Sequence, residues 1–516
     1  MRRLAAVGSL LLIVLGCSGG DAARPVRVPN PAPTPVPVGR SPAAVAPAPV
    51  TPTPVLSMPS GDDVTALVRA HNSSRFVAPP RQFRSGSVSP KQLDPSAIRR
   101  FAGGFRAHLP SGAPVVTPTV HHGLVLTSGG FHSRELYAFR ARTGELAWAI
   151  SLDDDGPSAA ACEGEVCAFN TESCTLFAVD VETGRMLWSR WLGDPLTSAP
   201  AIAGGLVYTS FPAAGGPEGD SHVLGAFELR TGEVRWARWI DSDVMSAPVV
   251  SEGRLYAASF AGTLYELAPS SGEILAAHRV RATSAPIVAG GELAYTRRTD
   301  AEGSAQAREA IASQSGSGTR VASERHAAWL DARTQGRTAY AQQGASLDSS
   351  NGFSGGAPSS ANASAAMRNV GRGNVSTMQS FQGSRLLHHA GSLYATQGDS
   401  IVSTDSRSGR ERWNVRLSGD VEQAGGALGA PPAFAGGSLF VATLAGEVLQ
   451  IDPASGSVRR RFAVGAPIRS QPAIVDGWIY VGTEDGQLVA LDTGDAANTG
   501  WTTWGANAGR TGVAPS

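Results

Sequence analysis

The sequence lacks an excess of charge of either sign. Its 43 Lys and Arg residues balance 43 Asp and Glu residues, and charged residues make up only 17% of the 516-residue chain. A neutral chain does not carry the basic surface that nucleic acids select, so we expect no nucleic-acid partner. Apolar residues make up 42%, which is enough for a large core, and most of the chain is therefore expected to fold.

Long hydrophobic runs are also scarce. The run at residues 4–15 is only about a dozen residues long, which is too short to span a bilayer as a stable helix. It follows the basic residues Arg2 and Arg3 and precedes Gly16 and Cys17, which is the layout of a secretory signal peptide.

The end of this run, Val14-Leu15-Gly16-Cys17, resembles the lipobox of bacterial lipoproteins. The resemblance implies that residues 1–16 are removed as a signal peptide and that Cys17 receives a lipid, which would be the protein's only attachment to a membrane. Ser18 follows the cysteine, and by the enterobacterial sorting rule this implies the outer membrane of a bacterial cell envelope, facing the periplasm. A plain secretory signal followed by an incidental cysteine is the alternative.

Residues 17–60 are rich in proline, often at alternate positions. Proline fixes φ and donates no hydrogen bond, so we expect a disordered, extended tether. Residues 61–97 are interpreted as a linker. The sequence Ser60-Gly61-Asp62-Asp63 before an apolar pattern could begin a short helix there.

The rest of the chain lacks a helical apolar period and repeats instead. A segment that begins with Ser-x-Pro and ends with tyrosine occurs at 198–208, 246–256 and 470–480. Each unit also holds two further short apolar runs and a turn glycine. The turn glycines are Gly144, Gly184, Gly232, Gly272, Gly336, Gly409, Gly456 and Gly494. Their spacing is mostly about 40 residues and predicts an all-β fold, an eight-bladed β-propeller of four-stranded blades over 98–512.

These units resemble the PQQ-type propeller repeat, through their Ser-x-Pro, Gly-x-x-Tyr, Ala-Leu-Asp and Thr-Gly-Glu-x-x-Trp pieces. Two units depart from it, with Ala276 and Arg460 in place of the tryptophan. The family contains quinoprotein dehydrogenases and also non-catalytic propellers, among them the lipoprotein subunit of the outer-membrane β-barrel assembly machine. The lipobox and the chain length resemble the second branch.

The last unit lacks a good fourth strand. Residues 105–109 lie at a suitable distance before the first unit, so we expect them to supply this strand and to close the ring by pairing with 487–492. A closed ring leaves no open edge between its first and last blades.

The residues that catalysis would need are missing. The family's dehydrogenases carry adjacent cysteines and a calcium site made of Glu, Asn and Asp, and this chain has no Cys-Cys pair and no Cys-x-x-Cys-His haem motif. We therefore predict no catalytic residues, no cofactor and no metal. The expected function is a non-catalytic interaction scaffold or assembly factor for envelope proteins. The alternatives are a PQQ-dependent quinoprotein dehydrogenase and a carbohydrate or cell-wall binder.

Three of the four cysteines fall in the second unit. Cys162 and Cys167 flank a predicted turn at Gly164-Glu165, so they should face each other and form a disulfide in an oxidising compartment. Cys174 could compete for Cys167. A three-cysteine zinc site and reduced core cysteines are the other possibilities.

The chain also contains two His-His pairs, His121-His122 and His388-His389. Both pairs lie at turns between the first two strands of units one and six. These units are three places apart in an eight-membered ring, so one metal ion could not use both pairs. We interpret them as solvated turn residues.

With strands A to D in order, B–C and D–A loops lie on one face of a propeller and A–B and C–D turns on the other. Three predicted insertions, at 211–222, 297–325 and 343–382, all fall on the first face. Long loops on a rigid scaffold often bind partners, so we predict that this face is the binding face. Its candidate acidic residues are Asp153, Asp154, Asp155, Asp194, Asp241, Asp243 and Asp420. Ordinary solvated loop acids are the alternative.

Overall fold

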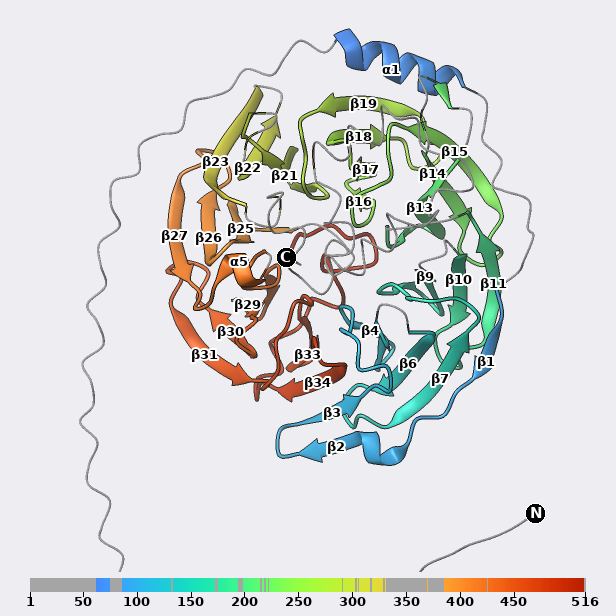
Figure 1. The fold of residues 1–516 in the computed structure, drawn as a ribbon, viewed down its shortest axis with the longest axis vertical. Helices are drawn as coiled ribbons and strands as arrows, with labels where there is room; N and C mark the ends of the chain where they lie inside the picture. Colours follow the sequence, from blue (N-terminus) through green and yellow to red (C-terminus); the bar gives the residue numbers. More distant parts are fainter. Residues whose placement is uncertain are drawn as a thin grey trace, which may run out of the picture. The chain divides into compact units, whose positions relative to one another are not determined.

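The computed structural model describes residues 62–74 and 86–514, apart from gaps at 131–132, 172–174, 194–197, 214–215, 218–219, 221, 290, 302–303, 305, 316–317, 328–329, 331–368, 370–384 and 425. The predicted signal peptide, Cys17 and the Pro-rich tether lie outside the described residues. The described strands form eight antiparallel sheets arranged in a ring (Figure 1), so the predicted eight-bladed propeller is confirmed.

The first four blades follow one another along the chain, each with strands A to D from the centre outwards. Blade one contains β4 (Thr119–His121), β5 (Leu124–Ser128), β6 (Glu135–Arg140) and β7 (Leu146–Leu152). Blade two contains β8 (Ala161–Glu163), β9 (Val166–Asn170), β10 (Thr175–Asp180) and β11 (Met186–Trp191). Blade three contains β12 (Ala201–Ala203), β13 (Leu206–Pro212), β14 (His222–Glu228) and β15 (Val234–Ile240). Blade four contains β16 (Val249–Ser251), β17 (Arg254–Ala258), β18 (Thr263–Leu267) and β19 (Ile274–Arg279).

The other four blades complete the ring. Blade five contains β20 (Ile287–Ala289), β21 (Glu292–Arg298), β22 (Arg308–Ser315) and β23 (Gly318–His326). Blade six contains β24 (Leu386–His389), β25 (Ser392–Gln397), β26 (Ser400–Asp405) and β27 (Glu411–Arg416). Blade seven contains β28 (Ala433–Ala435), β29 (Ser438–Ala442), β30 (Glu447–Ile451) and β31 (Val458–Ala463), and the short α5 (Val421–Ala424) precedes it. Blade eight contains β32 (Ala473–Val475), β33 (Trp478–Gly482) and β34 (Gln487–Asp492).

The middle strands are buried on both of their faces, because each sheet packs between two neighbours. All five residues of β5 and all five of β9 are buried. Phe169 and Phe177 of blade two join Leu124 and Leu126 of blade one in one apolar cluster. This packing explains why the strands read as continuous apolar runs rather than as alternating patterns.

The ring closes as the sequence predicts. β3 (Gly104–His108) pairs antiparallel with β34, with Phe105 opposite Ala490, and becomes the D strand of blade eight. β2 (Ile98–Phe101) pairs with β3 and adds a fifth strand outside it. A blade built from both ends of the chain removes the open edges that an unclosed ring would expose.

The segment before β2 runs along the outer edge of the ring. α1 (Asp62–Ser73) confirms the predicted short helix and packs against β19 and β15 (Figure 1). β1 (Val88–Pro90) pairs with β7 as a fifth strand of blade one, and η1 (Pro95–Ala97) leads into β2. Part of 61–97 therefore belongs to the propeller instead of forming a linker. In the described part of the chain, no helix has both the length and the apolar character needed to cross a membrane.

Blade five corrects the prediction for 297–325. This range was expected to be a B–C loop, with Gly336 as the following C–D turn, but it contains β22 and β23, the C and D strands. The sequence around Trp329 and Leu330 resembles the repeat's Ala-Leu-Asp strand. The prediction therefore placed the C strand about 20 residues after the position of β22. The B–C connection of this blade is only the short stretch between β21 and β22.

Candidate functional site

The centre of the ring is filled by the chain's own C-terminal segment, which we call the tail (residues 493–514; Figure 1). The tail bonds to the innermost strands of blades on different sides of the ring. The backbone N–H of Val120 donates to Thr502 O at 2.7 Å, that of Ile202 to Ala508 O at 2.8 Å and that of His388 to Gly512 O at 3.0 Å. Ile474 of blade eight pairs with Trp501. The tail thus satisfies backbone groups that the A strands would otherwise leave unpaired.

Arg510 holds the tail to blades two and three. Its side chain is fully buried and donates to Ala159 O at 3.2 Å and Pro200 O at 3.3 Å. Burial lowers the pKa of this guanidinium to about 10, and its hydrogen bonds go to backbone carbonyls and to the Thr503 hydroxyl. Trp501 and Trp504 are also fully buried. The Trp- and Gly-rich sequence of this tail did not predict that it occupies the channel.

Three of the seven predicted binding-face acids are buried. Asp154 accepts hydrogen bonds from Thr171 Oγ1 at 2.7 Å and Thr175 Oγ1 at 2.8 Å, so this loop of blade one is bonded to blade two. Asp241 and Asp243 belong to the loop that follows blade three. Asp241 accepts from Thr263 Oγ1 of blade four at 2.5 Å, and burial raises its pKa. Asp154 and Asp241 thus join neighbouring blades, while Asp243 accepts from Ser210 Oγ of its own blade, so these three acids are buried instead of forming a charged binding face as predicted.

The other candidate acids lie nearer the surface. Asp153 is exposed and accepts from the Ser87 backbone N–H at 2.9 Å, and Asp155 pairs with Arg134 at 2.5 Å. Asp420 is exposed and caps α5 by accepting from the backbone N–H of Glu422. Asp194 lies outside the described residues.

The two remaining predicted insertions differ from each other. In 211–222 only the middle is a loop, because β13 extends to Pro212 and β14 begins at His222. Its Asp220 is buried against α1, where the His71 imidazole bonds to the carboxylate at 2.6 Å. Residues 343–382 lie outside the described residues except for Asn369, whose side-chain amide donates to Ala282 O at 2.6 Å.

Cys162 and Cys167 form a disulfide across the A–B hairpin of blade two, with Cα atoms 4.1 Å apart. They are directly opposite each other in the β8–β9 register. Cys174 lies outside the described residues. Within the described ranges, no group of three or more His, Cys, Asp or Glu side chains is arranged to hold a metal ion.

The two histidine pairs make contacts with the following blade. His121 donates from Nε2 to Gly164 O of blade two at 2.7 Å, and burial lowers its pKa. His389 stacks on Phe434 of blade seven with ring centroids 3.8 Å apart. His388 is within the β24 strand that pairs with the tail. These residues are therefore less solvated than the sequence suggested.

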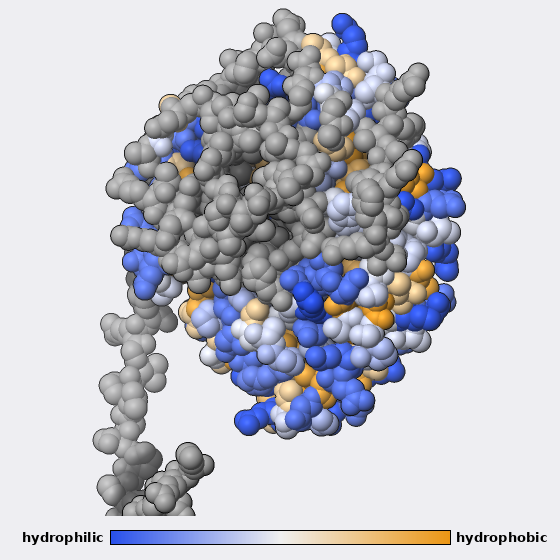
Figure 2. Space-filling view, turned by 45° about the vertical axis from the view of Figure 1, so that its right-hand side comes forward, coloured by the Kyte–Doolittle hydropathy of each residue, from blue (hydrophilic) through white to orange (hydrophobic). Residues whose placement is uncertain are grey.

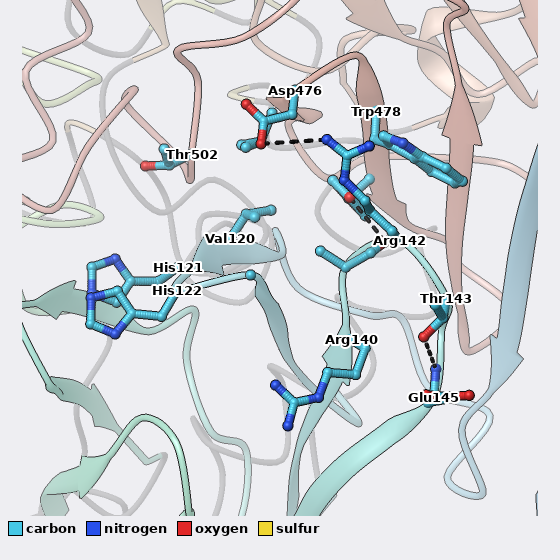
Figure 3. Close-up of a pocket in the computed structure, with 14 residues that line it drawn as sticks. Val120, His121, His122, Arg140, Arg142, Thr143, Glu145, Asp476, Trp478 and Thr502 are labelled. Atoms are coloured by element: carbon cyan, nitrogen blue, oxygen red, sulfur yellow. Dashed lines mark hydrogen bonds and ion pairs between the residues drawn. The ribbon is translucent and has the colours of Figure 1, made fainter. Parts of the chain in front are cut away.

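A pocket of about 550 Å³ opens between blades eight and one (Figure 3), which is a volume typical of small-ligand sites. It lies on the face of the A–B and C–D turns, opposite the predicted binding face. Five apolar or aromatic side chains line it: Val120, Ala141, Val475, Trp478 and Tyr480. The charged and imidazole side chains in its lining are His121, His122, Arg140, Arg142, Glu145 and Asp476.

The polar groups that line this pocket differ in how close they lie to their partners. Tyr480 is buried and donates to Ala141 O at 3.0 Å, and Glu145 pairs with Arg100 at 3.3 Å. Arg142 is 67% exposed and lies 3.9 Å from the Asp476 carboxylate, which is a loose contact. The pocket combines a half-buried indole with mobile cationic side chains, an arrangement that sequence reasoning did not find.

Comparison with solved structures shows shared fold only, because identities are low. BamB from Moraxella catarrhalis is 13% identical with a TM-score of 0.48, and the match covers 79% of this chain and 98% of that one. Saccharomyces cerevisiae Sqt1 is 10% identical with a TM-score of 0.51, covering 75% and 97%. The quinohemoprotein alcohol dehydrogenase of Comamonas testosteroni is 13% identical with a TM-score of 0.47, covering 78% and 77%.

No curated protein matches the chain. The family described as outer membrane protein assembly factor BamB matches residues 105–322, 219–392 and 397–514, which together span the whole ring from β3 to the tail. The chain therefore belongs to this family of PQQ-type propellers.

Proposed function

We propose that this chain is a non-catalytic propeller that binds other envelope proteins as a scaffold or assembly factor. In this proposal a lipid on Cys17 anchors it to the bacterial outer membrane, facing the periplasm. Membership of the BamB family supports the assignment to assembly. The observation that carries it is the filled centre of the ring.

A propeller offers two kinds of binding site, the central channel and the outer surfaces. Here Trp501, Trp504 and Arg510 are fully buried within the channel, and the tail bonds to several inner strands. Binding is therefore assigned to the outer surfaces. Among the described residues, Phe101 and Leu275 are the exposed large hydrophobic side chains, and Figure 2 shows hydrophilic and hydrophobic residues intermixed. We infer contacts that depend on polar groups and small pockets rather than on one apolar patch.

The rival assignment, a quinoprotein dehydrogenase, has a direct test. The purified full chain is incubated with PQQ and calcium, dialysed, and assayed for bound quinone and for alcohol-dependent dye reduction. We expect neither. Retained quinone together with dye reduction would contradict the proposal.

The lipid anchor is tested by the substitution Cys17→Ser. The variant should move from the membrane fraction to the soluble fraction after cell breakage, because a single short apolar segment does not hold a protein in a bilayer. Unchanged membrane retention would contradict the anchor but not the scaffold assignment.

The prediction that the B–C and D–A face binds the partner remains testable. Deletion of 343–365, which spares Asn369 and its hydrogen bond to Ala282 O, should leave stability nearly unchanged, because loop length contributes little to it. If this face is the working one, the deletion should reduce recovery of envelope partners that the full chain captures from detergent extracts. Full recovery, with 212–221 shortened as well, would exclude this face.

A further inference from the structure

The C–D turn of blade one departs from the pattern of the other blades. In blade two Asp180 ends the C strand, and its carboxylate accepts hydrogen bonds from the backbone N–H of Thr183 at 3.0 Å and from Thr183 Oγ1 at 2.7 Å. The same kind of bond is made by Asp405, Asp452 and Asp492 in blades six, seven and eight. An aspartate at this position thus caps its own turn.

Blade one has Arg140 at this position. The equivalence is fixed by the backbone, because Gly144 N–H donates to Arg140 O at 2.8 Å as Gly184 N–H donates to Asp180 O at 2.9 Å. A guanidinium cannot accept the capping bonds. Two residues further on, Arg142 replaces Glu182. The blade-one turn therefore carries two positive charges where the blade-two turn carries two negative ones.

Arg140 lines the pocket from blade one, and its guanidinium points away from that of Arg142, which lies beside Trp478 and Asp476 (Figure 3). Within the part of the chain that the structure describes, no hydrogen bond or ion pair is made by its guanidinium. Of the two acids in the lining, Glu145 already pairs with Arg100, and Asp476 lies 3.9 Å from Arg142. The pocket is therefore short of negative charge on the Arg140 side.

The A strand of blade eight ends in a short side chain beside the pocket. The last residue of the A strand reaches the next blade in three blades: His121 bonds to Gly164, Glu163 to the backbone N–H of Gly205, and His389 stacks on Phe434. In blade eight this residue is Val475, which is too short to bridge and lines the pocket instead. Apolar surface from Val475 and Trp478 thus lies beside the arginines.

We propose that this pocket binds an extended peptide segment of a partner protein, in which an acidic side chain precedes an aromatic or apolar one. The carboxylate pairs with Arg140, and the neighbouring side chain packs on the apolar surface that Val475 and Trp478 provide. Guanidinium and carboxylate form strong paired hydrogen bonds, and the indole supplies contact area. A neutral sugar would leave Arg140 without a counter-ion, which favours the peptide. This inference rests on the proposed scaffold function and names a contact that it uses.

The test measures fluorescence anisotropy of a labelled peptide, Ac-Ala-Gly-Asp-Phe-Gly-Ala, with the purified full chain. The wild type should bind it, and the Asn-Phe and Asp-Gly versions should bind about tenfold more weakly or less, since each loses one of the two contacts. Arg140→Asp introduces the aspartate that caps this turn in blades two, six, seven and eight, so this variant should fold and lose the binding. The matched control is Arg230→Gln, an exposed arginine in the C–D turn of blade three, which should bind as the wild type does.

A charge swap sharpens the result. Arg140→Asp should bind a Lys-Phe version of the peptide better than the wild type does. Equal binding of the Asp-Phe peptide by Arg140→Asp and wild type, equal binding of the Asp-Phe and Asn-Phe peptides, or no binding at millimolar peptide would overturn the inference. Binding of peptidoglycan fragments that is insensitive to Arg140→Asp would reassign the pocket to glycans. If the peptide does not bind while the protein still cross-links to envelope proteins in cells, the scaffold function stands and only this pocket assignment falls.

Discussion

The junctions between neighbouring blades differ in whether a D-strand tryptophan bonds across them. In four blades a D-strand tryptophan donates its indole N–H to a carbonyl in the C–D turn of the next blade. The pairs are Trp148 with Val181 O, Trp188 with Leu229 O, Trp236 with Pro269 O and Trp413 with Pro453 O, at 2.8–2.9 Å. Blades four and five lack this residue, with Ala276 and Ala322 in the corresponding positions.

The C–D turn glycine of the next blade packs against this tryptophan. A Cβ on Gly272 would lie 2.4 Å from the Trp236 ring, and one on Gly456 would lie 2.7 Å from the Trp413 ring. Both glycines also have positive φ, which other residues adopt at a cost. At the junction of blades five and six, a Cβ on Gly409 would lie 3.4 Å from Ala322, an ordinary contact. Positive φ therefore favours glycine at each of these three turns. At Gly272 and Gly456, contact with a tryptophan ring also excludes any larger residue.

Blade five has no tryptophan at either junction, and ion pairs join it to blade six instead: Arg325 with Glu411 at 2.7 Å and Arg385 with Glu309 at 2.8 Å. The long connection after β23 also leaves from this blade. Blades seven and eight use substitutes instead: Arg460 donates to Thr493 O at 2.5 Å, and Phe105 packs beneath Gly144.

The largest effect should come from Trp236→Ala, which empties a fully buried position. We expect a loss of about 3–5 kcal/mol in the free energy of unfolding, measured by denaturant titration. Trp236→Phe keeps most of the packing but not the N–H bond and should cost less. Comparable stability of the alanine variant and the wild type would show that these tryptophans do not hold the junctions.

The glycine comparison is tested by Gly272→Ala and Gly409→Ala. Each substitution should lower the free energy of unfolding by about 1 kcal/mol, because alanine adopts positive φ at a cost. Only Gly272→Ala also collides with a tryptophan, and its total loss should be about 3 kcal/mol. The two midpoints in urea provide the measurement. Equal losses at the two positions would remove the distinction between the two kinds of junction.

Blade two is held by a disulfide as well as by a tryptophan. Replacing both Cys162 and Cys167 with serine should cost about 2 kcal/mol, because a loop this short restricts the unfolded chain only a little. Cys174→Ser is the control and should leave stability unchanged. Peptide mapping of the non-reduced wild type should show Cys162 joined to Cys167, and an alkylated Cys162 would count against the bond.

The smallest effect concerns pH at the junction of blades three and four. Burial lowers the pKa of His222, although Asp243 and Asp241 nearby favour its charged form. The folded protein therefore resists protonating His222, while the unfolded chain protonates it near pH 6.5. Its contribution is complete above that pH and is lost as the pH falls, so stability should decrease by about 1 kcal/mol per pH unit at most. His222→Gln should decrease less between pH 6.5 and 5 in thermal unfolding, and equal slopes would contradict this assignment.

The sequence was sufficient where the repeat is regular. The turn glycines located seven of the eight blades, and counting strands located the closing strand at Phe105. Blade five was misplaced because the segment around Leu330 imitates the C-strand motif, while the real strand at 308–315 is rich in Ala and Ser. The acids of the D–A loops were assigned to the binding face, because sequence cannot show that Asp154 and Asp241 face threonines of the next blade.

The pocket could not be predicted from the sequence for a different reason. Arg140 and Val475 depart from the repeat at positions 335 residues apart in sequence, and each change is unremarkable alone. Only ring closure brings blades eight and one together, so the pocket depends on a contact between the two ends of the propeller. Aligning the C–D turns by charge would have singled out Arg140, although not Arg142, whose position holds Arg230 in blade three and Arg407 in blade six, and it would not have shown the cavity.

The central claim, that the outer surface binds envelope proteins, is tested most directly by photo-cross-linking in living cells. A photoreactive phenylalanine analogue is placed at Thr143 beside the pocket, at Asp420 on the opposite face and at Leu275 on the outer edge as a background control. We expect discrete adducts with other envelope proteins from Thr143, and from Asp420 if the loop-bearing face also takes part. The absence of adducts above the Leu275 background at both Thr143 and Asp420 would contradict the account.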